Sequence, residues 1–326
     1  CEFFFIIKRG ERYLMNANPT ATKILNFGSC NIDYVYSLNH FVTAGETEST
    51  EKMEVFPGGK GLNQSIALAR AGAKVYHAGF LGADGSWLLD LLRENRVDTS
   101  YLRKVEAKNG HAIIQVDAEG ENAIFLYPGS NKMLTEEYID SVLADFSKGD
   151  ILLLQNEINK VDFIVEKAYA RGMRVAFNAS PINEEIRKVD LSKVSYLLVN
   201  EVEIRAISGR KEYAEALNVL TQTYPRLCIM LTIGKGGCIY RTPSGESYQS
   251  AFDCKAVDTT AAGDTFTGYF LAGTAGGEEI SQTLRLSCAA AGIAVSRKGA
   301  APSIPERQEV LRQLPAMKEL SKKKIL

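Results

Sequence analysis

The chain contains 326 residues, of which 45% are hydrophobic and 24% are charged. This composition excludes a disordered, collagen-like or low-complexity polypeptide and indicates a globular protein with a full hydrophobic core. The 38 basic and 39 acidic residues are spread along the chain and give a formal net charge of −1, so we expect neither nucleic acid nor a membrane surface as a partner.

The six cysteines are widely scattered. They form no C-x-x-C pair and lie near no group of histidines, which argues against a zinc site and against a disulfide framework. Because thiols stay reduced in the cytoplasm, the sequence favours a cytoplasmic location.

The two ends of the chain are predicted to lie outside one large folded domain, which we place at residues 23–315. The apolar run at residues 3–7 is much shorter than the roughly 20 residues that span a bilayer, so residues 1–22 are interpreted as an N-terminal extension. A cluster of lysines makes residues 316–326 a basic tail, which we expect to be solvated.

Short apolar or β-branched runs alternate with amphipathic stretches along most of the chain. The short runs predict strands at residues 23–27, 75–80, 151–154, 174–177, 196–199 and 228–233. The stretches between them predict helices at residues 62–71, 86–94, 136–146, 160–171, 201–207 and 213–223. This alternation indicates an α/β fold in which helices cover a parallel sheet.

Two regions break the alternation. Residues 33–38 with 46–56, and residues 112–117 with 122–127, have the pattern of strands with no helix between them, and residues 118–121 are typical of a hairpin turn. We expect a small separate sheet, made from about residues 33–56 and 111–128, that forms a lid over a site. The alternative is an additional edge hairpin of the main sheet.

The most informative segment is residues 258–266, which follow an expected polar strand and open an apolar helix. The small residues Ala261, Ala262 and Gly263 leave backbone N–H groups uncovered at the start of that helix, where the helix dipole favours an anionic phosphate. Asp264 in this position is suited to accept a proton from a hydroxyl group that attacks a γ-phosphoryl group. The alternative is that Asp264 is an ordinary N-cap residue.

A second glycine-rich segment, residues 57–64, leads into an expected helix. Its glycines permit positive φ and the close approach of a ligand, and Asn63 offers an amide to a polyhydroxyl substrate. The segment is not a Walker A loop, because Gly61 rather than Ser or Thr follows Lys60. A glycine-rich turn that only starts a helix is the alternative.

Polar residues follow several predicted strands at their carboxyl ends, where open α/β sheets bind ligands. Asn31 and Asp33 can bind adjacent hydroxyl groups, and Glu203 can hold Mg²⁺ through water. Residues 232–237 form a glycine-lined turn suited to a nucleotide, but without the spacing of a dinucleotide site. Residues 294–303 offer turned carbonyls to a cation. Turn formation and helix capping explain the same residues without a ligand.

Together, these segments resemble one known family. Residues 57–82 are similar to the first signature of the ribokinase-like (PfkB) carbohydrate kinases, and residues 258–268 are similar to the second, which is highly specific. The resemblance runs from about residue 23 to residue 305 and is greatest to the ribokinases within the family. It implies a doubly wound, mostly parallel sheet flanked by helices, with a small β-sheet lid that often forms a dimer contact.

The resemblance also implies a role for each candidate residue. Asp264 corresponds to the catalytic base, and Ala261, Ala262 and Gly263 correspond to an anion hole. The sugar contacts correspond to Asn31, Asp33, Gly59, Lys60, Asn63, Glu157 and Asp264. The nucleotide contacts correspond to Asn200, Thr232, Gly234, Lys235, Gly237, Gly263 and Cys288. Glu203 corresponds to the Mg²⁺ residue, and the K⁺ positions correspond to Asp258, Thr260, Ala294, Arg297, Gly299 and Ser303.

The function implied by the resemblance is ATP-dependent phosphorylation of a sugar hydroxyl, D-ribose to D-ribose 5-phosphate, with Mg²⁺ as cofactor, K⁺ as activator and a homodimer formed through the lid. Cys30, Tyr34 and residues 177–181 depart from the family pattern. These departures leave fructose, a 2-keto-3-deoxy sugar acid or a nucleoside open as the acceptor. A sugar- or nucleotide-binding regulator without catalysis is disfavoured because Asp264 is retained.

Overall fold

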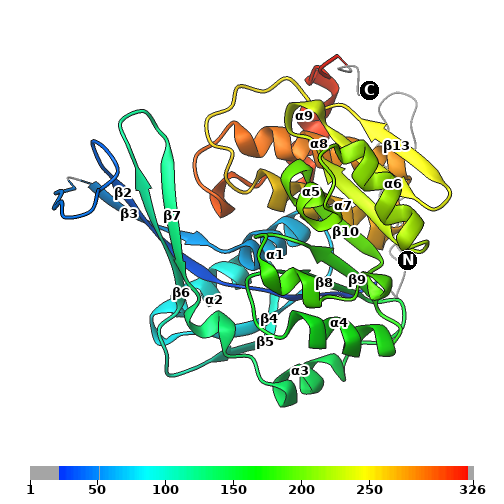
Figure 1. Ribbon diagram of the computed structural model, residues 1–326, viewed down its shortest axis with the longest axis horizontal. Helices are drawn as coiled ribbons and strands as arrows, with labels where there is room; N and C mark the ends of the chain where they lie inside the picture. The colour runs from blue at the N-terminus through cyan, green and yellow to red at the C-terminus, as the bar shows by residue number, and fades with distance from the viewer. Residues whose placement is uncertain (1–21, 51, 322–326) are drawn as a thin grey trace, which may run out of the picture.

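The centre of the molecule is a nine-stranded sheet (Figure 1). The computed structural model describes residues 22–50 and 52–321. The strands of this sheet are β1 (Ile24–Phe27), β4 (Val75–Leu81), β5 (Asp98–Lys104), β8 (Ile151–Gln155), β9 (Arg174–Asn178), β10 (Tyr196–Asn200), β11 (Cys228–Thr232), β12 (Cys238–Thr242) and β13 (Gly245–Gln249). Their order is β13-β12-β11-β10-β9-β8-β1-β4-β5, parallel from β11 to β5 and antiparallel at the β12 and β13 edge. The expected mostly parallel sheet is confirmed.

Helices pack on both faces of this sheet. They are α1 (Lys60–Arg70), α2 (Ser86–Glu94), α3 (Glu136–Leu143), α4 (Val161–Ala170), α5 (Glu201–Ser208), α6 (Tyr213–Thr223), α7 (Ala262–Gly276), α8 (Ile280–Val295) and α9 (Arg307–Gln313). On β8, Leu152 belongs to the core shared with α3 to α6, and Leu153 belongs to the core shared with α1, α2, α7 and α8. Burial of both faces explains why the central strands are continuous apolar runs.

The second sheet has four strands and stands out on the left of Figure 1. Its strands are β2 (Asn31–Ser37), β3 (Lys52–Gly58), β6 (Gly110–Val116) and β7 (Asn122–Tyr127), in the order β3-β2-β6-β7. The expected small separate sheet is therefore confirmed, and the alternative of an extra edge hairpin is wrong. The turn between β6 and β7 is closed by a hydrogen bond of 3.1 Å from the Asp117 N–H to the Glu121 carbonyl, as expected for a hairpin at residues 118–121.

Several expectations need correction. The strand expected from residue 46 begins only at Lys52, because the Glu46 carboxylate instead accepts a hydrogen bond from the Thr43 N–H at 3.0 Å within a loop. The polar strand expected before Asp258 does not form, and Phe252 makes only an isolated bridge to Glu319. β5, β12 and β13 were not predicted, because their partly exposed residues lack a clear apolar pattern.

The proposed N-terminal extension, except for residue 22, and the lysines at residues 322–324 lie outside the described residues. The described part of the expected tail is not a free solvated segment, because the Leu320 N–H donates to the Ala251 carbonyl at 2.8 Å and Met317 packs against the core. Among residues 22–50 and 52–321, no helix combines the length and the apolar character needed to cross a membrane.

Two glycines allow α1 to approach its neighbours closely. A Cβ atom on Gly61 would lie 2.3 Å from the Ser29 backbone nitrogen, at the end of β1. A Cβ atom on Gly268, in α7, would lie 2.4 Å from the Cβ atom of Ala67 in α1. Real Cβ atoms do not approach this closely, so a side chain at Gly61 would push α1 away from β1, and one at Gly268 would push α7 away from α1. α1 is thus fixed against β1 at its beginning and against α7 farther along.

We expect Gly268→Ala to lower the free energy of unfolding by about 1–3 kcal/mol, because the added methyl group overpacks the α1–α7 contact. Gly276→Ala is the matched control in the same helix, since the nearest atom to its added Cβ would be 3.9 Å away. The control should leave stability unchanged or raise it slightly through helix propensity. Urea denaturation measures both variants, and equal effects would contradict the close-packing argument.

Candidate active site

The site lies where the order of the large sheet reverses. The chain leaves β1 toward β4 and β5 on one side and returns to β8 on the other side. Open α/β sheets bind ligands at the carboxyl ends of strands beside such a reversal. Ser29 follows β1 at this point, and Glu157 follows β8.

Glu157 joins the loop after β1 to the beginning of α1. Its carboxylate accepts a hydrogen bond of 2.9 Å from the Lys60 N–H and another from the Ser29 hydroxyl group. Burial raises the pKa of Glu157, while the nearby Lys60 charge opposes that shift. Gly59, directly before α1, has φ of 91°, a left-handed conformation that favours glycine.

Asn31 and Asp33 lie at the base of the small sheet, on β2. The Asn31 side-chain oxygen accepts a hydrogen bond of 2.7 Å from the amide of Asn131, and both residues are buried. Burial, followed by the charge of Glu157, raises the pKa of Asp33 to about 7. The sequence-predicted sugar residues therefore lie around one polar region at the junction of the two sheets.

Asp264 is in the first turn of α7 and is only 6% exposed. One of its carboxylate oxygens accepts a hydrogen bond of 3.1 Å from the Asn63 amide, and the other accepts one of 2.8 Å from the Gln64 amide. The N-cap residue of α7 is Ala261, with φ of 59°, so the alternative that Asp264 is an ordinary N-cap is wrong. The two glycine-rich segments of the sequence meet at this carboxylate.

A cavity of about 80 Å³ lies between the carboxyl ends of the strands and the beginning of α7. It is lined by Lys60, Asn178, Ser180, Leu198, Val199, Asn200, Glu203, Met230, Thr232, Gly263, Asp264, Phe266 and Thr267. Candidate residues for the sugar, the nucleotide, the metal and the base are thereby brought to one space.

Asn200 and Glu203 form a capping box at the beginning of α5. The Asn200 side-chain oxygen accepts from the Glu203 N–H at 2.9 Å, and the Glu203 carboxylate accepts from the Asn200 N–H at 2.8 Å. The helix-capping alternative is therefore correct for both residues. Only one Glu203 oxygen is used by the cap and the carboxylate lines the cavity, so its chemistry also fits a water-mediated contact to Mg²⁺.

The other nucleotide candidates lie farther along the same side. Gly234, Lys235 and Gly237 follow Thr232 in a short turn between β11 and β12. A Cβ atom on Gly237 would lie 2.0 Å from the Gln249 carbonyl oxygen, so this position requires glycine. Cys288 is buried in α8 with its sulfur 3.7 Å from that of Cys238 and is not among the residues that line the cavity.

The candidate cation positions come from two loops that the structure holds together. The Asp258 carboxylate accepts hydrogen bonds of 2.9 Å from the N–H groups of Thr260 and Gly299. The Asp258 N–H also donates to the Val295 carbonyl at 3.1 Å. The carbonyl of Ala294 accepts from the Arg297 N–H at 3.1 Å. These bonds hold the two loops together through a carboxylate and backbone carbonyls, which are oxygen groups of the kind that bind a monovalent cation.

Further along the second loop, the side chains have other partners. The Arg297 guanidinium pairs with Glu309, and the Ser303 hydroxyl donates to the Ala300 carbonyl at 2.7 Å. The Arg297 side chain can therefore not serve a cation, and only its backbone oxygen remains. The Ser303 hydroxyl oxygen keeps its lone pairs after it donates, so it remains a possible ligand.

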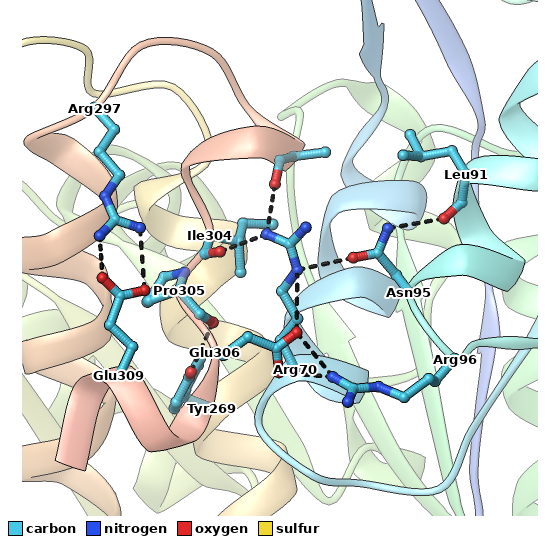
Figure 2. A network of polar contacts seen from close by, with 11 residues as sticks. Arg70, Leu91, Asn95, Arg96, Tyr269, Arg297, Ile304, Pro305, Glu306 and Glu309 are labelled. Atoms are coloured by element: carbon cyan, nitrogen blue, oxygen red, sulfur yellow. Dashed lines mark hydrogen bonds and ion pairs between the residues drawn. The ribbon is translucent and has the colours of Figure 1, made fainter. Parts of the chain in front are cut away.

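Arg70, at the end of α1, fixes the chain beyond this loop (Figure 2). Its guanidinium donates to the carbonyls of Ala301 at 3.0 Å and Ile304 at 2.5 Å, and to the Asn95 side chain at 2.8 Å. Nearby, the Tyr269 hydroxyl of α7 donates to the Pro305 carbonyl at 2.8 Å (Figure 2). α1 therefore contacts the Asp264 region at one end and the chain after the cation loop at the other.

Known proteins resemble this chain over most of its length. The family model described as "pfkB family carbohydrate kinase" matches residues 21–307. The chain belongs to the pfkB family of carbohydrate kinases. A ribokinase of Haemophilus influenzae is 32% identical over 296 residues, which cover 87% of this chain and 95% of that protein.

Solved structures of ribokinases resemble this carbohydrate kinase as well. The Cryptococcus neoformans ribokinase in complex with ADP has a TM-score of 0.79 and 31% identity, covering 90% of this chain and 99% of that one. The Arabidopsis thaliana ribokinase complexed with ribose and ATP has a TM-score of 0.78 and 26% identity, with the same coverage. The ribokinase-like fold expected from the sequence is confirmed.

Sequence reasoning missed several polar residues of this pfkB kinase that support the site. They are Asn26, Ser29, Gln64, Ser65, His77, Asn131, Gln155 and Asn178. A signal was available for some of them, because a lone amide or imidazole stands within an otherwise apolar run on β1, β4 and β8. A polar side chain in a fully buried strand needs a hydrogen-bond partner, which marks it for attention.

We expect Arg70→Met to lower the free energy of unfolding by about 2–3 kcal/mol, because the buried carbonyls of Ala301 and Ile304 lose their donor. Arg96→Gln is the matched control, since Arg96 pairs with Glu306 at an exposed site where its side chain is 65% exposed. We expect the control to cost less than about 1 kcal/mol. Guanidinium denaturation measures both, and a stable Arg70→Met variant would show that the network contributes little.

Proposed function

We propose that this kinase transfers the γ-phosphoryl group of ATP to the primary hydroxyl group of D-ribose, giving D-ribose 5-phosphate and ADP. The observation that carries the proposal is the position of Asp264, a buried carboxylate at the N-terminal end of α7 that lines one cavity with Lys60 and Gly263. A base at that place is what an attacking alcohol requires, and the helix terminus favours the phosphate that it attacks.

In the proposed reaction, Asp264 takes the proton of the ribose hydroxyl group while the ribose oxygen forms a bond to the γ-phosphorus. The bond from that phosphorus to the β,γ-bridging oxygen breaks, and ADP leaves with the electron pair. The backbone N–H groups of Ala261, Ala262 and Gly263, around the N-terminal end of α7, stabilise the negative charge on the transferred group. This is electrostatic positioning together with general-base catalysis.

We propose that the sugar is held by Asn31, Asp33, Gly59, Lys60, Asn63 and Glu157. The side-chain oxygen of Asn63 supports this, because it is buried and has no hydrogen-bond partner among residues 22–50 and 52–321, while its nitrogen donates to Asp264. A buried acceptor without a donor costs free energy, and a sugar hydroxyl group would supply the donor. The carboxylates of Asp33 and Glu157 offer further acceptors to a polyol.

The proposed nucleotide contacts are Asn200, Thr232, Gly234, Lys235, Gly237, Gly263 and Cys288. Mg²⁺ held through water by Glu203 would neutralise charge on the phosphate oxygens of ATP. K⁺ is proposed to bind the carbonyls and the carboxylate of the two loops that contain Asp258 and Gly299. A K⁺ ion bound there, beyond the N-terminal end of α7, would fix the shape of the proposed anion hole.

We also propose a cytoplasmic homodimer that forms through the small sheet. β7 is an edge strand of that sheet, and Ile124, Phe125, Leu126 and Tyr127 are each at least half exposed. Because successive side chains point to opposite faces, both faces of β7 present apolar surface, which an isolated edge strand rarely does. A second copy of the sheet would cover it. The described cysteines, Cys30, Cys228, Cys238, Cys254 and Cys288, are free, which is consistent with a reducing compartment.

To test the base, we expect Asp264→Asn to lower turnover by about 10²-fold or more, because general-base catalysis typically contributes that much. The assay measures ADP release with ATP, Mg²⁺ and K⁺ against D-ribose, 2-deoxyribose, fructose, a sugar acid and a nucleoside. Calorimetric ATP binding should be nearly unchanged, which separates loss of catalysis from loss of folding.

Asp90→Asn is the control for this assay, since Asp90 is an exposed residue of α2. It should retain full turnover. Full activity of Asp264→Asn would contradict the proposal that Asp264 is the base. Higher turnover with another acceptor would contradict the proposal that D-ribose is the substrate.

Substituting tetramethylammonium for K⁺ should lower turnover. Unchanged turnover would contradict the proposed K⁺ site.

To test the dimer, we expect Phe125→Glu to convert a dimer into a monomer, because a charge at the centre of the apolar edge must be desolvated on association. Sedimentation velocity measures the assembly. Trp87→Glu is the control, because Trp87 is an exposed aromatic residue on α2 and does not belong to the strands of the small sheet. A monomeric parent protein, or a Phe125→Glu dimer, would contradict the proposed interface.

A further inference from the structure

A continuous chain of buried polar side chains leads from Asp264 into the interior of the sheet. Gln64 donates to the Asp264 carboxylate at 2.8 Å and accepts a hydrogen bond of 2.7 Å from Gln155. Gln155 also donates to the side-chain oxygen of Asn26 at 2.9 Å. None of the three amide side chains is more than 1% exposed, and they come from α1, β8 and β1.

The partners of Gln64 leave its amide only one orientation. Its nitrogen faces two oxygens, one on the Asp264 carboxylate and one on Asn178, at 2.8 and 3.2 Å. The Asn178 amide is itself fixed, because its nitrogen donates to the Leu198 carbonyl at 3.2 Å. The Gln64 oxygen must therefore face Gln155, which has to act as the donor.

Gln155 is the branching point of the chain. Its amide nitrogen uses both protons, one toward Gln64 and one toward Asn26. Asn26 is held in turn, since its nitrogen donates to the Gly61 carbonyl and to the Ser65 hydroxyl, each at 2.8 Å. A backbone carbonyl only accepts, so the orientation of Asn26 is fixed from this end as well.

The far branch ends at a neutral histidine. The Ser65 hydroxyl lies 2.8 Å from Nδ1 of His77, and Nε2 of His77 lies 3.2 Å from the Gly28 carbonyl. Burial lowers the pKa of His77 to about 4, so the ring is neutral near pH 7. Nε2 then carries the proton toward Gly28, and Nδ1 accepts from Ser65. Asp264 is the one member of this chain that carries a charge.

The other charged groups around Asp264 lie outside the chain. Lys60 of α1 attracts it, Glu157 after β8 repels it, and Glu203 of α5 interacts with Lys60. None of them hydrogen-bonds to Gln64 or Gln155 in the described residues. A change in the amides can therefore be separated from a change in these charges.

We infer that Gln64 is a positioning residue for Asp264 and that Gln155 is a positioning residue for Gln64. The inference rests on the proposed function, in which Asp264 is the base. The two amides fix the direction of the carboxylate and stabilise its ionised form before the sugar arrives, so that no reorganisation is needed during the reaction. Apolar side chains would fill the same space without burying polar groups. Packing alone therefore does not explain why the five other members of the hydrogen-bonded chain are polar, namely Gln64, Gln155, Asn26, Ser65 and His77.

The test uses Gln64→Met and Gln155→Met, which keep the length of the side chain and remove its amide. We expect each to lower kcat by about 10- to 100-fold, as for a slightly misplaced catalytic group, with KM for ATP and the sugar changed less than about threefold. The acid limb of the kcat profile should move to higher pH, because the ionised carboxylate loses a donor. The double variant should lose no more than the Gln64→Met variant, since the two residues act in series.

Asn159→Met is the matched control, because the Asn159 amide makes two hydrogen bonds to the backbone of Leu134 and none to this chain. It should leave kcat and the pH profile unchanged. If Gln155→Met does not fold, as judged by its melting temperature and ATP binding, Gln64→Asn replaces it. That variant keeps an amide but withdraws it from Asp264, and the same pH shift is expected.

The outcomes separate the two proposals. Full turnover of Asp264→Asn would overturn the proposed base and this inference together. An inactive Asp264→Asn with full kcat and an unshifted pH profile in the glutamine variants would overturn the inference alone. Equal losses in kcat without any pH shift, or additive losses in the double variant, would also overturn it, because they indicate only a structural role.

Discussion

The arrangement of the active site follows from one contact, between the beginnings of α1 and α7. Asn63 and Gln64 hold the two oxygens of Asp264 across about two hundred residues of sequence. The contact depends on the close packing of α1 against the end of β1 at Gly61 and against α7 at Gly268. It unites a glycine-rich loop that suits a sugar with a helix terminus that suits a phosphate, and neither segment alone would define a kinase site.

The site concentrates carboxylates that burial would otherwise drive toward neutrality. Desolvation raises the pKa of Asp33 to about 7 and also raises that of Glu157. The Lys60 charge opposes the shift at Glu157, and the amides of Asn63 and Gln64 donate to the carboxylate of Asp264. The folded protein thus keeps acceptors for hydroxyl groups in a region that is poorly hydrated, where each hydrogen bond to a ligand is strong.

α1 also connects regions that serve different proposed ligands. It begins at Lys60, beside Glu157, and ends at Arg70, whose guanidinium holds the backbone of Ala301 and Ile304. A rigid helix transmits the position of one end to the other. The loop proposed for K⁺ is therefore placed relative to Asp264 by the same element that carries the proposed sugar contacts.

Local sequence patterns predicted the α/β class, most central strands and helices, the small separate sheet and the candidate base, because apolar periodicity and helix-start motifs depend only on neighbouring residues. It did not predict β5, β12 or β13, whose partly exposed residues form strands only beside an existing edge. The partners of Asp264 and Asn31, and the amide chain through Gln155 and Asn26, were decided only by the tertiary structure. Hydrogen bonds between distant segments depend on which side chains close packing brings within about 3 Å, and no local pattern contains that information.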